Sequence, residues 1–225
     1  MMKIKKLIFE ESKFDSIICL NAKLPGKSFF GRFPECEIIA ADGAALKLMD
    51  IGVNCDYIIG DMDSFYKDPR SEHFEKKKII NLPDQNSNDF EKILNWCIEN
   101  DRKNLLITGM HGGELEHTLN NQSVLLRYAR RLNMCVYDAG RYGLPIFESI
   151  EFDCRNGEII SIIPFMTAVL TTRNLKWELN NSTLKYGENE GARNQSEAGN
   201  VEIILHEGFF MLFLDSKAPK CPFFL

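Results

Sequence analysis

The sequence lacks an excess of positive charge and any long hydrophobic run, and each absence excludes a class of protein. Its formal net charge is -5, whereas nucleic-acid-binding proteins are usually basic, so we expect no nucleic-acid partner. No apolar run approaches the roughly 20 residues that a membrane-spanning helix needs. The apolar piece near the N-terminus is also too short for a signal peptide. These features predict a cytoplasmic protein with no membrane partner.

Paired cysteine motifs are also missing. The seven cysteines are scattered along the chain, and none forms a C-x-x-C pair. No Cys/His cluster has the ligand spacing of a zinc site, which argues against structural zinc. Scattered cysteines, several of them in apolar stretches, are typical of buried thiols in a reducing compartment.

The N-terminal part of the chain alternates short apolar runs with helical segments. Brief runs closed by Gly, Asp or Asn are typical of buried parallel strands. They lie at residues 16–20, 38–41, 57–59, 105–107 and 134–137. Helices are expected at 44–49, 89–99 and 115–132, the last with Leu119, Val124, Leu125 and Tyr128 facing the core. This βαβα order predicts an α/β domain with a largely parallel sheet.

Helix signals fade after about residue 140. Strands are expected at 149–152, 159–164, 168–172, 175–179, 201–205 and 209–214, separated by turns such as Asn156-Gly157 and Glu207-Gly208. We therefore predict an α/β N-terminal domain over residues 1–142 and a smaller all-β sandwich over residues 143–225.

Two acids follow one predicted strand directly. Asp61 and Asp63 lie one residue apart after the run 57–59. Ligands in open α/β sheets bind beyond the carboxyl ends of the strands, and paired carboxylates there can hold a hard cation. Ser64 adds a hydroxyl for a phosphate or for a metal-bound water. An Asx-type turn with solvated acids would explain the same residues equally well.

Asp42 and Gly43 close the preceding strand in the same manner. Gly43 permits close approach of a ligand to the backbone, and the next helix offers its N-terminal N–H groups to a phosphate. Asp42 could instead be an ordinary helix cap.

Two further clusters precede helices. Asp89 could be another carboxylate for the cation, and Lys92, one turn later, could meet a phosphate; a capped helix with a surface lysine is the alternative. The glycine-rich turn 109–113, which includes Gly112, can cradle phosphate through backbone N–H groups. His117 could touch a nucleotide or simply lie on the surface.

All four clusters fall at predicted strand-to-helix junctions on one edge of the sheet. Three supply carboxylates and one supplies a phosphate-binding type of loop. This is the equipment of Mg²⁺–nucleotide chemistry, in which positioning and charge neutralisation do most of the catalysis.

The order of these motifs resembles the thiamine pyrophosphokinase family along nearly the whole chain. The matching stretches are Ala41–Ala44, Gly60–Ser64, Asp84–Lys92, Gly109–His117, Thr171–Trp177 and Gly187–Asn194. The resemblance implies an α/β catalytic domain and a β-sandwich, with ATP and thiamine as substrates and Mg²⁺ as cofactor. It also implies a homodimer with sites at the subunit interface.

The resemblance further implies residue roles. Asp61, Asp63 and Asp89 would bind Mg²⁺ and the ATP phosphates, and either Asp63 or Asp89 would accept the proton of the thiamine hydroxyl. The remaining nucleotide-binding candidates are Asp42, Gly43, Ser64, Asn88, Lys92, Gly112 and His117.

Three residues are candidates for thiamine binding: Gln85, Trp177 and Asn194. A flat aromatic such as Trp177 suits the cationic thiazolium, because its π face attracts positive charge. A tryptophan buried in the core of the sandwich is the alternative.

The sequence departs from the family pattern at five positions. Glu114 stands where an arginine is expected near the ATP phosphates. Glu116 replaces an aspartate, Leu46 an asparagine, Asn174 a glycine and Arg193 a serine. Arg193 or Lys185 could restore the missing positive charge. Three rival functions therefore stay open: a thiamine-binding protein that has lost turnover, a pyrophosphokinase for another alcohol, and a Mg²⁺-dependent phosphohydrolase.

Overall fold

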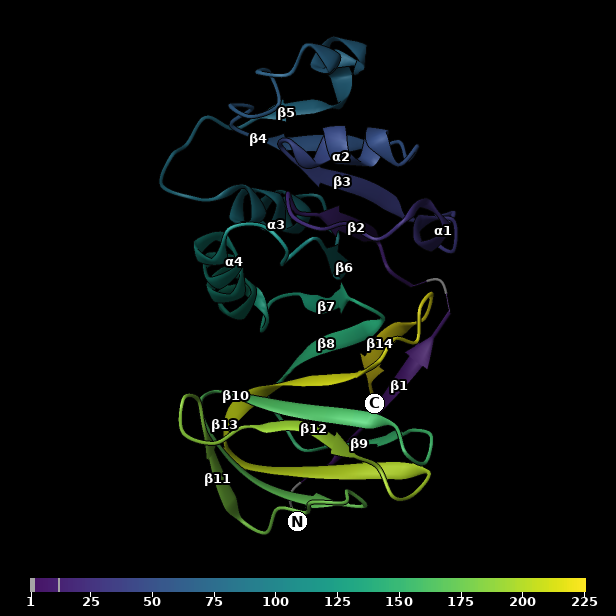
Figure 1. Cartoon of the computed structure of the whole chain (residues 1–225), viewed down its shortest axis with the longest axis vertical. Coiled ribbons are helices and arrows are strands. Elements are labelled where there is room, and N and C mark those ends of the chain that lie inside the picture. Colours follow the sequence, from purple (N-terminus) through teal and green to yellow (C-terminus); the bar gives the residue numbers. More distant parts are fainter. Residues whose placement is uncertain (1–2, 12) are drawn as a thin grey trace. The chain divides into compact units, whose positions relative to one another are not determined.

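The chain forms two compact units. The computed structural model describes residues 3–11 and 13–225 (Figure 1). One unit lies between residues 12 and 139, and the other combines residues up to 11 with residues 140–225. The helices of the described chain all lie in the first of these units.

The N-terminal segment differs from the prediction that residues 1–142 form one domain. Strand β1 (Lys5–Glu10) pairs in parallel with β9 (Ile150–Asp153) and antiparallel with β14 (Cys221–Phe224). Figure 1 shows the purple β1 beside the yellow β14. Both partners lie far along the chain, so the pattern of residues around β1 carried no sign of this pairing.

The first unit contains a wholly parallel sheet, as the sequence predicted. Its strand order is β7-β6-β2-β3-β4-β5. The strands are β2 (Ser16–Cys19), β3 (Glu37–Ala41), β4 (Tyr57–Gly60), β5 (Ile79–Asn81), β6 (Asn104–Thr108) and β7 (Asn133–Asp138). β5, which follows a run of lysines, was not foreseen.

Helices connect these strands. They are α1 (Lys27–Phe30), α2 (Ala44–Asp50), α3 (Asp89–Glu99) and α4 (Leu115–Tyr128), with short 3₁₀ segments η1 (Pro69–His73) and η2 (Lys76–Lys78). α4 ends four residues before the predicted end. Val124, Leu125 and Tyr128 are buried as expected, but Leu119 is 51% exposed. Leu119 lies about 140° around the helix from Val124, which places it on the opposite face.

The strand order reverses at β2. β3 pairs with β2 on one side, and β6 pairs with β2 on the other. In open α/β sheets the connections at such a switch point leave a crevice at the carboxyl ends of the strands. The polar clusters after β3, β4 and β6 therefore lie around this point.

In its described residues the second unit contains strands, turns and loops but no helix. Besides β1, β9 and β14 it contains β8 (Arg141–Ile146), β10 (Ile159–Arg173), β11 (Ser182–Lys185), β12 (Gly191–Gln195) and β13 (Asn200–Asp215). β10 joins two predicted strands into one, and so does β13. The strand predicted at 175–179 does not form, since Leu175 makes only an isolated bridge with Ser196.

β10 and β13 pair along most of their length through an irregularity. The register shifts between Pro164 and Ala168, where Met166 has a left-handed φ of 64°. On β13, Gly208 has φ +82°, and a Cβ there would lie 2.0 Å from the Thr167 carbonyl oxygen. The sequence predicted a turn at Glu207-Gly208, but Gly208 lies at a bulge inside a continuous strand.

Several cysteines are deeply buried. Burial raises the pKa of the Cys19 thiol to about 12 and that of Cys97 also to about 12. These side chains therefore stay protonated at neutral pH and behave as small apolar core residues. In the described part of the chain, no helix has both the length and the apolar character needed to cross a membrane.

Candidate functional site

A cleft of about 510 Å³ opens in the α/β unit where the parallel strands end. Residues directly after β2, β3, β4 and β6 line it, together with the first turns of α3 and α4. The sequence-predicted residues among its lining are Asp42, Asp61, Ser64, Gln85, Asn88, Asp89 and His117. The structure thus brings most of the predicted nucleotide-site residues together around one space.

Three carboxylates gather in this cleft. Asp42, Asp61 and Asp89 each offer an oxygen within 4.8 Å of the others. Asp63, which was expected in this group, is exposed and lies outside it. The backbone N–H of Asp63 donates to Asp61 Oδ1 at 3.2 Å, so the two acids form a local turn. Asp42 takes the place in the group that the sequence assigned to Asp63.

Asp42 also fixes the loop that carries Asp61. Its side chain is only 4% exposed, and its backbone has a left-handed φ of 43°. Its two carboxylate oxygens accept the N–H groups of Ser64 and Phe65 at 3.1 and 3.0 Å. The alternative role of helix cap does not apply, because Gly43 occupies the N-cap of α2 and no side chain caps it.

Gly60 makes the approach of the carboxylates possible. A Cβ at this position would lie 2.9 Å from Asp89 Oδ1 and 3.1 Å from Asp42 Cβ. Gly43 has a similar constraint, with a would-be Cβ 2.9 Å from the Asn21 side-chain amide nitrogen. The missing side chains leave room for a cluster of oxygens, which are the ligands that a hard divalent cation prefers. The donor set and the space therefore fit such a cation.

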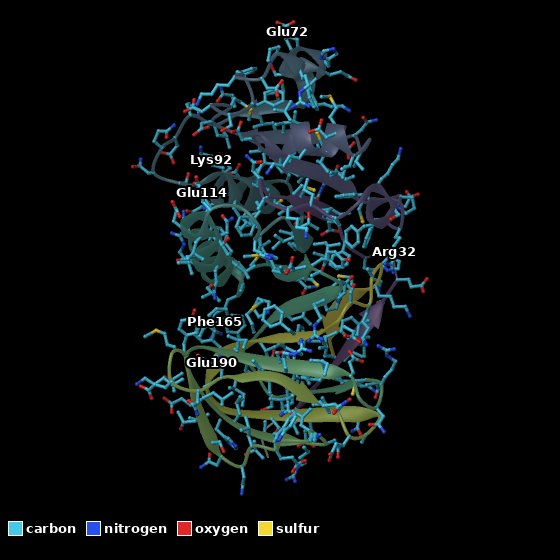
Figure 2. All side chains as sticks on the ribbon, viewed as in Figure 1. Arg32, Glu72, Lys92, Glu114, Phe165 and Glu190 are labelled. Carbon is cyan, nitrogen blue, oxygen red and sulfur yellow. The ribbon has the colours of Figure 1, made fainter. Side chains whose placement is uncertain are left out.

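Lys92 lies beneath the carboxylates rather than at the surface of the cleft. Its side chain is 3% exposed, and its Nζ is 3.4 Å from Asp89 Oδ1 and 3.6 Å from Asp61 Oδ2. Lys92 is not among the residues that line the cleft. Figure 2 labels it on α3. The structure thus gives Lys92 two carboxylate neighbours and no open path to a phosphate.

The environment shifts the pKa values of two of the acids in opposite directions. Burial raises the pKa of the Asp89 carboxyl, and neighbouring Asp42 and Asp61 add to the rise, against the opposing charge of Lys92. At Asp61 burial acts upward as well. The Asp63 N–H, the Lys92 charge and the Gln85 amide outweigh it, so that its pKa is lowered.

The loop before α3 is held by its own polar side chains. Asn88 Oδ1 accepts the N–H of Glu91 at 2.9 Å and so caps the helix, while Asn88 Nδ2 donates to Asn121 Oδ1 at 3.2 Å. Gln85 Nε2 donates to Asp61 Oδ2 at 3.2 Å. Gln85 is therefore tied to the carboxylate group, and Asn88 to both helices.

The glycine-rich turn after β6 packs closely against the segment after β2. Gly109 has φ +71°, and a Cβ there would lie 2.3 Å from the Leu20 carbonyl oxygen. Gly112 has φ +100°, with a would-be Cβ 2.7 Å from Lys23 Cβ. Gly109 and Gly113 line the cleft, whereas Gly112 does not line it and lies against Lys23. The glycines allow the backbone to border the cleft directly.

The first turn of α4 carries the departure from the family pattern. Glu114 precedes the helix and lines the cleft, and its Oε2 lies 3.2 Å from His117 Nε2 (Figure 2). Both side chains are exposed, at 72% and 74%. Among the described residues that line the cleft there is no Lys or Arg, whereas four are acidic. The described side chains that line this cleft therefore offer no Lys or Arg charge to an anionic ligand.

In the β unit, Trp177 is on the surface. Its side chain is 58% exposed, and Lys176 Nζ lies 5.0 Å from the ring centroid. Asn194 is buried; its Oδ1 accepts the Trp177 N–H at 3.1 Å, and its Nδ2 donates to the Trp177 carbonyl at 2.7 Å. Trp177 is therefore no core residue, and the Asn194 amide holds the backbone that presents it.

The structure explains two of the departures from the family pattern. Asn174 has φ 64°, and asparagine tolerates this left-handed region better than most residues, so it can replace a glycine. Leu46 is buried in α2, where an apolar side chain packs well. Arg193 is exposed with φ 57°, and Lys185 contacts Glu188. Nothing in the structure explains the choice of arginine at position 193.

Sequence reasoning missed several polar residues of the cleft. Asn21 follows β2 and lines the cleft, as Asp42 does after β3. The same strand-end rule could have found it. Asn121 and Thr118 also line the cleft from α4. Asn121 comes one helical turn after His117, so helical spacing was the available signal.

Comparisons with known proteins identify the family of the chain. A model of the thiamin pyrophosphokinase catalytic domain matches residues 35–137, and one of the thiamin pyrophosphokinase vitamin B1 binding domain matches residues 149–209. The chain belongs to the thiamin pyrophosphokinase family. The match to the catalytic-domain model includes Asp42, Asp61 and Asp89. The match to the vitamin B1 binding domain model includes Trp177 and Asn194.

Individual relatives support the same family. The chain is 26% identical over 170 residues to thiamin pyrophosphokinase 1 of Caenorhabditis elegans, and this match covers 67% of each of the two chains. It is 29% identical over 151 residues to thiamine pyrophosphokinase 2 of Arabidopsis thaliana, covering 59% of this chain and 55% of the plant protein.

Solved structures share the fold. Thiamine pyrophosphokinase from Bacillus subtilis superposes with a TM-score of 0.74 at 21% identity, covering 90% of this chain and all of that one. Yeast thiamin pyrophosphokinase superposes with a TM-score of 0.75 at 18% identity, covering 89% of this chain and 85% of the yeast chain. The fold is therefore the mixed, sheet-rich α/β architecture of these proteins.

Proposed function

We propose that this cleft transfers a pyrophosphate group from ATP to the hydroxyl of thiamine, giving thiamine diphosphate and AMP. As a member of its family the chain is an ATP:thiamine diphosphotransferase. The observation that supports the cleft as the reaction site is the group of Asp42 and Asp61, which directly follow strands, with Asp89, the first residue of α3. Family membership does not favour the three rival functions.

We propose Mg²⁺ as the cation and Asp42, Asp61 and Asp89 as its protein ligands. When bound, Mg²⁺ neutralises charge on the transferring phosphates and orients them. The chain's own part is to keep the three oxygens together. The Asp42 hydrogen bonds to the 64–65 backbone and the bare Cα of Gly60 do this. The start of α4 lines the same cleft, and the backbone N–H groups of a helix N-terminus suit an anion.

The proton acceptor for the thiamine hydroxyl was left open between Asp63 and Asp89. We propose Asp89, because it lines the cleft and Asp63 does not. Burial raises the pKa of Asp89, which makes its carboxylate a stronger base. Gln85, hydrogen-bonded to Asp61, is placed to orient the alcohol beside these groups.

For thiamine we propose a surface that includes the exposed ring of Trp177, with Asn194 holding its backbone. We further propose a homodimer in which the β unit of one subunit completes the thiamine site of the other. The exposed Trp177 and Met166 supply apolar surface for such a contact. We also propose a cytoplasmic location, which the buried thiols of Cys19 and Cys97 support.

We also propose that the β unit is a sandwich. The first half of β10 pairs with β12 and with the second half of β13, which pairs with β8. The second half of β10 pairs with β11 and with the first half of β13, which pairs with β9. Two half-sheets that share one long antiparallel pair of strands are a natural basis for a sandwich.

The test is to incubate the purified protein with thiamine, ATP and Mg²⁺ and to follow AMP and thiamine diphosphate together. We expect equal amounts of both products, and none in the presence of EDTA. Saturable thiamine binding without either product would instead identify a binding protein. Release of inorganic phosphate without thiamine diphosphate would identify a phosphohydrolase.

Glu114 offers a separate test of nucleotide binding. Because no Lys or Arg lines the described cleft, Glu114→Arg should lower the KM for ATP about tenfold by reversing a charge beside the phosphates. The matched control is Glu116→Arg, since Glu116 lies in the same turn but does not line the cleft. Steady-state kinetics would measure both. An equal fall of KM in the two variants would show a general charge effect only.

A further inference from the structure

Lys92 is a buried side chain of the site to which the proposed reaction assigns no role. Its side chain is 3% exposed, and its ammonium lies within 4 Å of two carboxylates, Asp89 at 3.4 Å and Asp61 at 3.6 Å. A charged group that deep in a protein needs a partner of opposite sign. Here both partners are members of the group that would receive the divalent cation.

The surface of the cleft carries the opposite charge. Asp42, Asp61, Asp89 and Glu114 all line it, and no Lys or Arg does so among the described residues. Three carboxylate oxygens within 4.8 Å of one another repel each other strongly unless a positive charge compensates them. In the structure the Lys92 ammonium is the cation in contact with two of these three acids.

We propose that Lys92 is a positioning residue that acts as an internal counter-ion, holding Asp61 and Asp89 together before the divalent cation arrives and weakening the binding of that cation alone. This inference rests on the proposed function, because the cation is the one assigned to Asp42, Asp61 and Asp89. The ammonium shares the carboxylates with the metal and repels it. A metal–triphosphate complex brings its own negative charges and is repelled less.

The consequence is selectivity for the metal–nucleotide complex over either component. The acidic cleft disfavours a triphosphate that arrives without a cation. The buried ammonium disfavours a divalent cation that arrives without a triphosphate. In the metal–triphosphate complex each component offsets the repulsion that the other would meet alone. The site therefore favours binding of the complex over binding of either component.

The test measures Mn²⁺ binding to the full chain by calorimetry, without ATP or thiamine. Lys92→Met should bind Mn²⁺ roughly tenfold more tightly than the unaltered protein, because a nearby repelling charge is gone. Its Tm in EDTA should fall, and the rise of Tm on adding Mn²⁺ should be larger than for the unaltered protein. A purely structural role of Lys92 would lower the Tm but would not tighten Mn²⁺ binding.

Further variants control for charge and for folding. Lys103→Met removes a positive charge from the same unit, but Lys103 is exposed and contacts Asp101, so its Mn²⁺ affinity should stay unchanged. Lys92→Arg keeps the charge and should bind Mn²⁺ as weakly as the unaltered protein. Lys92→Gln, which retains a polar head, replaces Lys92→Met if that variant does not fold.

Two outcomes would overturn the proposal, and they differ in what else they affect. Unchanged or weaker Mn²⁺ binding by the neutral Lys92 variants, with binding abolished in Asp61→Ala, would refute the counter-ion role and leave the metal site intact. Mn²⁺ binding that Asp61→Ala does not alter would refute the metal site itself, and the counter-ion role with it.

Discussion

Asp61→Ala is expected to reduce the formation of thiamine diphosphate by at least about 10³-fold while the protein stays folded. Asp61 belongs to the group of three carboxylates and accepts the Gln85 amide, so its loss removes a cation ligand and frees a neighbouring side chain. Its side chain is 21% exposed on a loop, so little core packing is lost. We expect the free energy of unfolding to change by about 1 kcal/mol or less.

Two companion variants make this result specific. Asp101→Ala removes an exposed acid of the same unit that contacts Lys103, and it should leave turnover unchanged. Asp63→Ala decides between the geometry of the structure and the sequence prediction, since Asp63 lies outside the carboxylate group. A loss in Asp63→Ala equal to that in Asp61→Ala would mean that the loop rearranges to bring Asp63 to the cation.

Gly60→Ala is expected to cost about 10²-fold in turnover although it adds only one methyl group. The new Cβ would lie 2.9 Å from Asp89 Oδ1 and 3.1 Å from Asp42 Cβ, closer than such atoms normally come. At least one of the two carboxylates must then move by several tenths of an ångström. Misplacement of catalytic groups on the ångström scale can cost about this much in rate.

The control for this variant is Gly26→Ala in the same unit. Nothing lies within 4 Å of a Cβ at Gly26, so turnover and Tm should match those of the unaltered protein. Circular dichroism would check the fold of both variants, and Mn²⁺ calorimetry would report the geometry of the site separately from turnover. Normal turnover and normal Mn²⁺ affinity in Gly60→Ala would contradict the close approach of the three acids.

The parallel sheet was predictable because its strands are short apolar runs that end in Gly, Asp or Asn. That local pattern placed β2, β3, β4, β6 and β7 within one or two residues. The strand-end rule then located the cleft, since residues after parallel strands share one edge of the sheet. The rule applies to Asp42 and Asp61, which directly follow predicted strands, whereas Asp89 was expected here only because it precedes a helix.

What could not be predicted depends on distances between residues remote in sequence. Asp61 and Asp63 look equivalent in the sequence, but the turn sends only Asp61 toward Asp42 and Asp89. Lys92 looks like a surface lysine one turn into a helix, yet α3 places it under two acids. Gly60 appeared to be a simple strand terminator, and its role is visible only once Asp89 lies beside it.

The pairing of β1 with β9 and β14 has a consequence for the order in which the chain can fold during its synthesis. Residues 5–10 are synthesised before their partners at 150–152 and 221–224. All strands of the parallel sheet emerge in between, so the α/β unit can fold while the first strand still has no partner. Strand β1 therefore lacks its β14 partner, and has an edge open to chaperones and to misassembly, until residues 221–224 have been synthesised.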